Sequence, residues 1–287
     1  MKKLSLLFVA AMSISVSAFA QDKEDDFDKK WRFGLRVTPQ PVWLLSSDKN
    51  NIPKGTSFGS GFGLNIETRL SDIVGISWGI GGDFEGGNYD FKLDTAGKYE
   101  VYYLRDADQF VYPTKVTNTT QLYALKSRSI KTTHVTLPIQ LKLSTAEYDG
   151  LKWFGMFGGE IGIRVKSTAT DTYYNVYKYS ATSTNTLLPY ATATGQTEEK
   201  DIDIKDETTL IPLRVGLNAG IGAEYRLGGS TSAFISLNYF RSFTNLMKKT
   251  SDYTFYRVDN ANNQATFSFV KQNLKQSAIR INLGILF

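Results

Sequence analysis

Residues 58–70, FGSGFGLNIETRL, and residues 74–85, VGISWGIGGDFE, are the most informative stretch of this chain. In both segments the apolar residues all fall at every second position, and the residues between them are mostly glycine or charged. A period of two is typical of a β-strand with two unlike faces. Only a few residues around Ser71-Asp72 separate the segments, so we expect them to pair as an antiparallel hairpin.

The same alternation recurs along the rest of the chain. With the two segments above, the predicted strands are 31–44, 58–70, 74–85, 132–143, 151–166, 210–227, 233–246 and 277–287. Short connections alternate with longer ones, which include three long loops near 87–131, 167–209 and 247–274. Outer-membrane barrels have short turns at one end and long loops at the other. The sequence therefore predicts an all-β fold, an eight-stranded antiparallel up-and-down transmembrane β-barrel with long extracellular loops.

Alternation alone does not distinguish a membrane barrel from a soluble, lipocalin-like one. The glycines favour the membrane barrel, because they share a face with charged residues in the predicted strands. On a solvated outer face, glycines such as Gly61, Gly63, Gly79 and Gly81 would weaken the strands without improving packing. Inside a narrow lumen they make room for arginine and glutamate side chains. We therefore expect the apolar face to contact outer-membrane lipid.

The N-terminal segment predicts the compartment. Lys2 and Lys3 precede an apolar run, and Ala18-Phe19-Ala20 matches the small-x-small pattern of a signal-peptidase site. We expect residues 1–20 to be a signal peptide, residues 21–30 a flexible periplasmic leader, and residues 31–287 the barrel domain. An even number of strands then places both termini in the periplasm, with the barrel in a bacterial outer membrane.

Composition excludes several classes of function. The chain has 287 residues, no Cys and a single His. The lack of Cys excludes thiolate metal sites and cysteine nucleophiles, and a single His argues against a His-rich metal centre. Removing the two signal lysines takes Lys+Arg from 33 to 31 against 28 acids, a net charge of +3. That balance does not indicate a nucleic-acid partner. We expect no cofactor, no metal and no enzymatic activity; His134, predicted at the rim of the barrel, has no nucleophile at a recognisable spacing.

Several segments resemble a known family. The glycine-rich hairpin, the strand LPIQLKL at 137–143, the segment GGEIG at 158–162 and the terminal strand 279–287 are similar to the PorT-like outer-membrane β-barrel domain of Bacteroidetes. The resemblance implies a part in protein secretion of the type IX kind or in envelope assembly, with protein partners there. The final residue, Phe287, resembles the C-terminal signal that barrel-assembly machinery recognises.

One candidate site is a set of inward-facing charges of both signs. Such charges either pair across a narrow lumen and fill it or line a gated ion path, and we favour the filled lumen. The predicted members of this lumen charge network are Arg32, Arg36, Glu67, Arg69, Asp83, Glu85, Lys142, Glu160, Arg164, Arg214, Glu224, Arg226 and Arg280.

Tyrosines concentrate in two of the long loops. They suit strands that extend beyond the membrane and an aromatic girdle at its interface, which we favour, but also recognition of a glycan or protein. The candidate binding residues are Tyr102, Tyr103, Tyr173, Tyr174, Tyr177 and Tyr179. The sequence therefore predicts a non-enzymatic membrane-embedded scaffold or accessory protein, with a surface binding protein acting through these loops as the alternative. A small channel is a third hypothesis.

Overall fold

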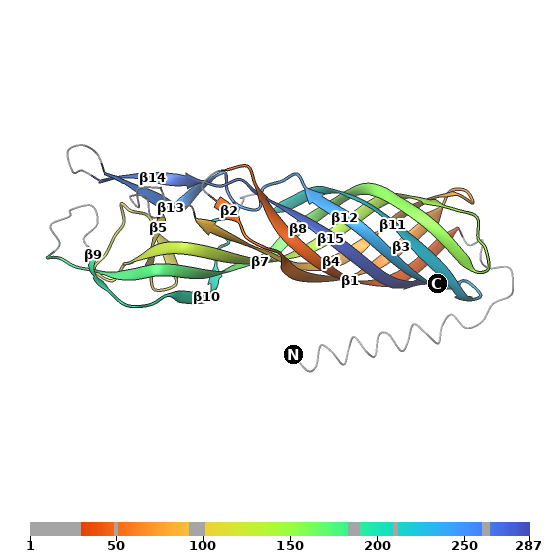
Figure 1. The fold of residues 1–287 in the computed structure, drawn as a ribbon, viewed down its shortest axis with the longest axis horizontal. Helices are drawn as coiled ribbons and strands as arrows, with labels where there is room; N and C mark the ends of the chain where they lie inside the picture. The colour runs from red at the N-terminus through yellow and green to blue at the C-terminus, as the bar shows by residue number, and fades with distance from the viewer. Residues whose placement is uncertain (1–29, 49–50, 92–100, 183–189, 209–211, 260–264) are drawn as a thin grey trace.

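The computed structural model describes residues 30–48, 51–91, 101–182, 190–208, 212–259 and 265–287. The predicted signal peptide and all but Lys30 of the predicted leader lie outside these residues. Eight strands of the described chain form a closed ring (Figure 1). They are β1 (Trp31–Ser46), β3 (Ser57–Arg69), β4 (Val74–Phe91), β7 (Gln121–Ser144), β8 (Leu151–Tyr179), β11 (Leu213–Gly228), β12 (Thr231–Ser242) and β15 (Leu274–Leu286).

The ring is an antiparallel meander that closes on itself. Each of these strands pairs with the next along the chain, and β15 pairs with β1 in a register that sets Val37 opposite Leu283. Phe33 and Phe287 exchange backbone hydrogen bonds of 3.2 and 2.7 Å at the closing seam. The predicted eight-stranded up-and-down barrel is confirmed. The predicted seventh strand ends earlier than expected, at Ser242 rather than residue 246.

The ends of the barrel differ as predicted. The connections β3–β4, β7–β8 and β11–β12 are tight, and Gly150 and Gly229 adopt φ values of 76° and 54° that L side chains rarely take. The C-terminus lies at this end, which we name the turn end (Figure 1). The remaining connections meet at the opposite end.

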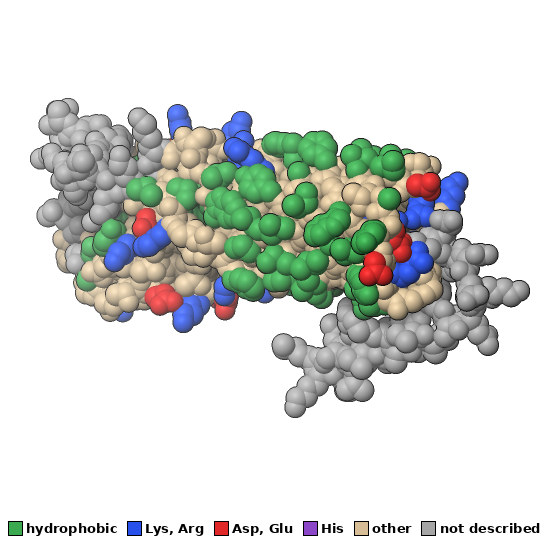
Figure 2. Space-filling model, turned by 45° about the vertical axis from the view of Figure 1, so that its right-hand side comes forward, with side chains coloured by type: hydrophobic (Ala, Val, Ile, Leu, Met, Phe, Trp, Pro, Cys, Tyr) green, Lys and Arg blue, Asp and Glu red, His purple; other side chains and the backbone are tan. Residues whose placement is uncertain are grey.

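A broad apolar belt surrounds the barrel. Along β8, Trp153, Phe157, Ile161, Ile163 and Val165 all face outward and are exposed. Figure 2 shows such side chains gathered over the middle of one face, with charged groups beyond them toward both ends. Exposure of so much apolar surface is stable against lipid and unfavourable in water, so this belt is the membrane-facing wall. No helix in the described part of the chain has the length and apolar character needed to span a membrane.

The long loops are a second folded layer rather than irregular chain. A membrane strand needs about 10 residues, whereas β8 has 29 and β7 has 24. Both strands continue beyond the belt, where further strands pair with them or with their neighbours. These are β2 (Asn51–Pro53), β5 (Val101–Asp106), β6 (Gln109–Val111), β9 (Tyr190–Ala193), β10 (Glu198–Asp203), β13 (Thr250–Asp259) and β14 (Ala265–Lys271).

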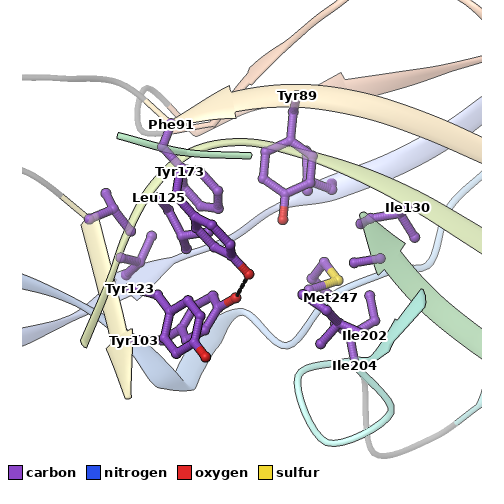
Figure 3. Packing of buried hydrophobic residues seen from close by; sticks show 14 of the residues in the cluster. Tyr89, Phe91, Tyr103, Tyr123, Leu125, Ile130, Tyr173, Ile202, Ile204 and Met247 are labelled. Carbon is purple, nitrogen blue, oxygen red and sulfur yellow. Dashed lines mark hydrogen bonds between the residues drawn. The ribbon is translucent and has the colours of Figure 1, made fainter. Parts of the chain in front are cut away.

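These strands and the described chain that connects them, together with residues 85–91, 121–133 and 166–179 of β4, β7 and β8, form what we name the cap. Its buried core includes Tyr89, Tyr103, Leu125, Ile130 and Met247 (Figure 3). The core contains residues from three of the four connections at this end, so these three pack together. The prediction of extended strands is confirmed for the loops near 87–131 and 167–209.

A β-bulge separates barrel from cap. His134 lies opposite Arg164, but Thr133 lies opposite Lys166, so Val165 is an extra residue in β8. Side-chain parity reverses there, since Glu160 and Gly162 point inward below the bulge while Ala169 and Asp171 are buried above it. The bulge explains why strict alternation ends at the membrane boundary.

Candidate functional site: a filled lumen beneath a folded cap

Four charged side chains form a closed circuit in the lumen near the turn end. Glu224 accepts a hydrogen bond of 2.6 Å from Arg32 and one of 2.9 Å from Lys142. Glu67 accepts bonds of 2.9 and 2.6 Å from the same two cations. Each carboxylate thus bridges both cations, and the charges cancel. We name these four residues the turn-side cluster.

A second group lies further along the lumen, toward the cap. Arg214 donates to Glu160 at 2.6 Å and to Glu85, while Arg280 donates to Glu85 at 3.0 Å and also to Glu160. Asp83 accepts from both arginines at 3.2 Å. Arg36, also buried, interacts electrostatically with Asp83 and Glu160. These three arginines and three carboxylates, here named the cap-side cluster, also balance in charge.

Polar and aromatic side chains complete the filling. Asn282 donates to Ser236 at 3.0 Å and to Asn238 at 3.1 Å on the neighbouring strand. Phe240 lies 4.1 Å from the Arg280 guanidinium and 4.7 Å from that of Arg214, so the apolar ring stabilises charge from its face.

Glycines make this packing possible, as predicted. A side chain at Gly63 would place its Cβ 3.1 Å from Nε of Arg36, and one at Gly162 would stand 3.1 Å from Nε of Arg214.

The remaining predicted network residues lie outside both clusters. Arg69 is near the opening at the turn end, and Arg226 donates to Glu147 of the β7–β8 turn at 3.0 Å. Arg164 lies at the membrane boundary and donates to the carbonyl of Leu246 at 3.1 Å. Nine of the thirteen predicted residues are therefore in direct ion pairs within the two clusters, and Arg36 adjoins the second.

His134 is inside the barrel and not at an accessible rim. It is 2% exposed, and its Nδ1 lies 3.6 Å from Oε2 of Glu85. The imidazole lines a small pocket at the cap-side end of the lumen, together with Arg164 and Arg214.

The cap contains a buried ion pair that sequence reasoning missed. Arg128 donates two hydrogen bonds, of 2.6 and 2.7 Å, to the two carboxylate oxygens of Asp171, and both side chains are fully buried. Tyr103 donates to Asp171 at 3.0 Å, and Tyr173 contacts the Tyr103 hydroxyl at 2.5 Å (Figure 3). Burial, together with the Asp171 charge, raises the pKa of both phenols above the ordinary tyrosine value. Reversed parity beyond Val165 hid this pair from the sequence pattern.

The structure corrects the proposed tyrosine surface. Tyr102, Tyr103 and Tyr173 are buried in the cap, so they cannot contact a ligand at its surface. Tyr177 and Tyr179 are partly buried, and Tyr179 packs edge-on against Tyr190 at 5.9 Å. Of the six, Tyr174 is exposed. Most of these tyrosine rings are at least partly buried, because the connections fold into a cap that has its own core.

Fold and site together define a class of protein: an eight-stranded transmembrane barrel whose lumen is filled by paired charges. The chain belongs to the family of the outer membrane protein beta-barrel domain, whose family model matches residues 19–248. Membership supports a location in the bacterial outer membrane.

The chain is also similar, at low sequence identity, to several solved structures of outer-membrane proteins. Neisserial surface protein A is 9% identical, with a TM-score of 0.34. The alignment covers 88% of this chain and 95% of that chain. The outer membrane protein OprG from Pseudomonas aeruginosa is 9% identical, with a TM-score of 0.39, and the alignment covers 92% of this chain and 99% of OprG. A major outer membrane protein from Thermus thermophilus is 12% identical, with a TM-score of 0.38, and the alignment covers 90% of this chain and 99% of that protein. No curated protein matches the sequence.

Proposed function

We propose that this protein is a non-enzymatic, non-conducting scaffold of the outer membrane that presents its cap outside the cell, with both termini in the periplasm. The observation that carries the proposal is the combination of a filled lumen with a prefolded cap. A barrel with this interior acts through its surfaces, and the cap provides most of the surface outside the membrane.

The lumen supports the non-conducting part of the proposal. An eight-stranded barrel is just wide enough for its own side chains. Here the turn-side and cap-side clusters lie one after the other along the lumen, and within each cluster the positive and negative charges are paired. An ion entering would have to displace bonded partners.

The position of His134 supports the non-enzymatic part. General acid or base catalysis needs a group within hydrogen-bond reach of a substrate, and this side chain is buried inside the barrel. A purified preparation in detergent should show no hydrolysis of peptide or ester substrates. Activity that a His134→Ala substitution abolished, with the fold retained, would contradict the proposal.

The partners that we favour are proteins of secretion, of the type IX kind, or of envelope assembly, as the PorT-like resemblance implies. The test is crosslinking of the tagged chain in its native outer membrane, followed by purification and mass spectrometry. Stoichiometric recovery of such components supports this role. Recovery of the barrel alone would contradict it and favour a ligand outside the cell.

A specific observation favours that second candidate, capture of an external ligand. Phe110, Tyr112 and Tyr253 stack on the cap, with ring centroids 5.4 Å apart for Phe110–Tyr253 and 4.7 Å for Tyr112–Tyr253. Tyr112 is exposed and the other two rings are partly so. Aromatic faces of this kind suit sugar or peptide recognition. Tyr112→Ala should abolish binding to cells or a glycan array if this role holds, whereas Tyr148→Ala, on a turn at the other end, should not.

A further inference from the structure

The wall of the barrel changes strands at the membrane boundary. Below this point β11 pairs with β8, ending with Leu213 opposite Ile163. Above it β10 is the neighbour, starting with Asp203 opposite Thr168. Between Ile163 and Thr168 a groove of about 440 Å³ opens beside β8. It lies at the level of the Val165 bulge, where the apolar belt meets the cap.

Cations line this groove from several directions. Arg164 and Lys166 come from β8, Lys205 follows β10, and Lys248 comes from the chain after β12. Lys131 is exposed on β7, in register with Thr168, and adds a charge on the adjoining surface. Two carboxylates, Asp203 and Asp206, also line the groove, and Lys248 is paired with Asp252. Among the described residues no carboxylate forms an ion pair with Lys166 or Lys205.

A buried hydroxyl in the groove lacks a partner. Ser167 is 4% exposed, and its Oγ makes no hydrogen bond within the part of the chain that the structure describes. A buried polar atom without a partner is unfavourable unless a ligand or solvent bonds to it. The hydroxyl is therefore a ready donor for an anionic oxygen.

The lower edge of the groove is apolar. Val165 and Pro212 line the groove and are exposed, and Val165 and Leu213, the residue after Pro212, belong to the membrane-facing belt. The groove thus joins a cationic upper part to a lipid-facing lower part. A molecule with a phosphate group above and acyl chains below matches this division, whereas a soluble anion would use only the upper part.

We propose that this groove binds the phosphate-bearing headgroup of a glycolipid of the outer leaflet, with its acyl chains against the belt. This inference rests on the orientation given under Proposed function, which places the cap and the groove on the outer side. Lys166, Lys205 and Arg164 would supply charge to the phosphate, and Ser167 a hydrogen bond.

The test is native mass spectrometry of the full barrel released from neutral phosphatidylcholine nanodiscs that contain lipid A. The Lys166→Gln/Lys205→Gln double variant removes two exposed charges from the groove. A basic residue near an anionic surface contributes about a fivefold effect on binding, so the pair should weaken lipid A binding roughly 25-fold. The matched control, Lys115→Gln/Lys271→Gln, loses the same charge from elsewhere on the cap and should bind as the parent does.

Three comparisons identify the ligand. Dephosphorylated lipid A should bind much more weakly than lipid A. The single substitution Ser167→Ala should weaken the binding of lipid A severalfold. This variant should keep the gel mobility that a folded barrel shows without heating. Equal binding by the double variant and its control would overturn the proposal. So would equal binding of phosphatidylglycerol, or full displacement of lipid A by inorganic phosphate. Partner recovery by crosslinking is measured on the same variants, so failure of the lipid site is distinguishable from failure of the scaffold role.

Discussion

At the residue scale, Glu224 holds the turn-side cluster together, because its two oxygens bridge Arg32 and Lys142. Glu224→Gln leaves two buried cations sharing the charge of Glu67. Breaking a buried pair costs about 3–5 kcal/mol, so we expect a loss of that order in the free energy of unfolding, measured by urea titration in lipid vesicles. Glu147→Gln breaks the partly exposed bond to Arg226 and should cost at most about 1 kcal/mol. Similar losses for the two variants would refute this account of the cluster.

A glycine in β4 gives a second prediction at this scale. A Cβ at Gly79 would lie 2.0 Å from the carbonyl oxygen of Leu64 on the paired strand, so alanine there must push β3 and β4 apart. We expect Gly79→Ala to destabilise the barrel by about 1–3 kcal/mol, the usual cost of overpacking. Gly155 is the control, since its nearest non-neighbouring atom would be 3.9 Å away. The fraction of folded barrel on unheated gels measures both variants, and equal fractions would contradict the prediction.

At the element scale, the Arg128–Asp171 pair joins the outer parts of β7 and β8. Asp171→Asn removes the charge partner of a fully buried guanidinium, which typically costs about 3–5 kcal/mol. Because both residues lie beyond the belt, the loss should fall on the cap and leave the barrel wall intact. Hydrogen exchange should therefore increase in the cap and stay unchanged in residues 135–143. Uniform exchange throughout would show that cap and barrel unfold as one unit.

The same element predicts a response to alkaline pH. The pKa values of Tyr103 and Tyr173 are raised above the ordinary value, mainly by burial. Above about pH 10 these phenols ionise in the unfolded cap but stay neutral in the folded one. Their contribution to cap stability is therefore complete below about pH 10 and decreases as pH rises toward the folded-state pKa values. Protease resistance of the cap should decline above about pH 10, and Tyr103→Phe should make the decline shallower.

At the scale of the whole molecule, a filled lumen and a closed cap predict no ion current. Planar-bilayer recording of the purified barrel should give no defined conductance steps at neutral pH. The Arg214→Ala/Arg280→Ala variant removes two large side chains and opens space between Glu85 and Glu160, so it should admit cations if it folds. Regular conductance steps from the parent protein would refute the scaffold proposal, because they would show an open path.

The sequence by itself determined the barrel, because lipid on one side and a polar lumen on the other impose a period of two. That period assigned the eight wall strands, the inward position of residues such as Glu160 and Arg280, and the glycines beside them. It did not assign which charges meet, since partners such as Arg32 and Glu224 are far apart in the chain.

Only the tertiary structure decided the cap. The extra residue Val165 reverses parity in β8, so alternation read from the membrane segment points to the wrong face above it. Tyr103 and Tyr173 were candidates for surface binding because tyrosine suits both an interface and a core. They are buried because segments from three connections meet there, and a contact between distant segments leaves no periodic trace in the sequence.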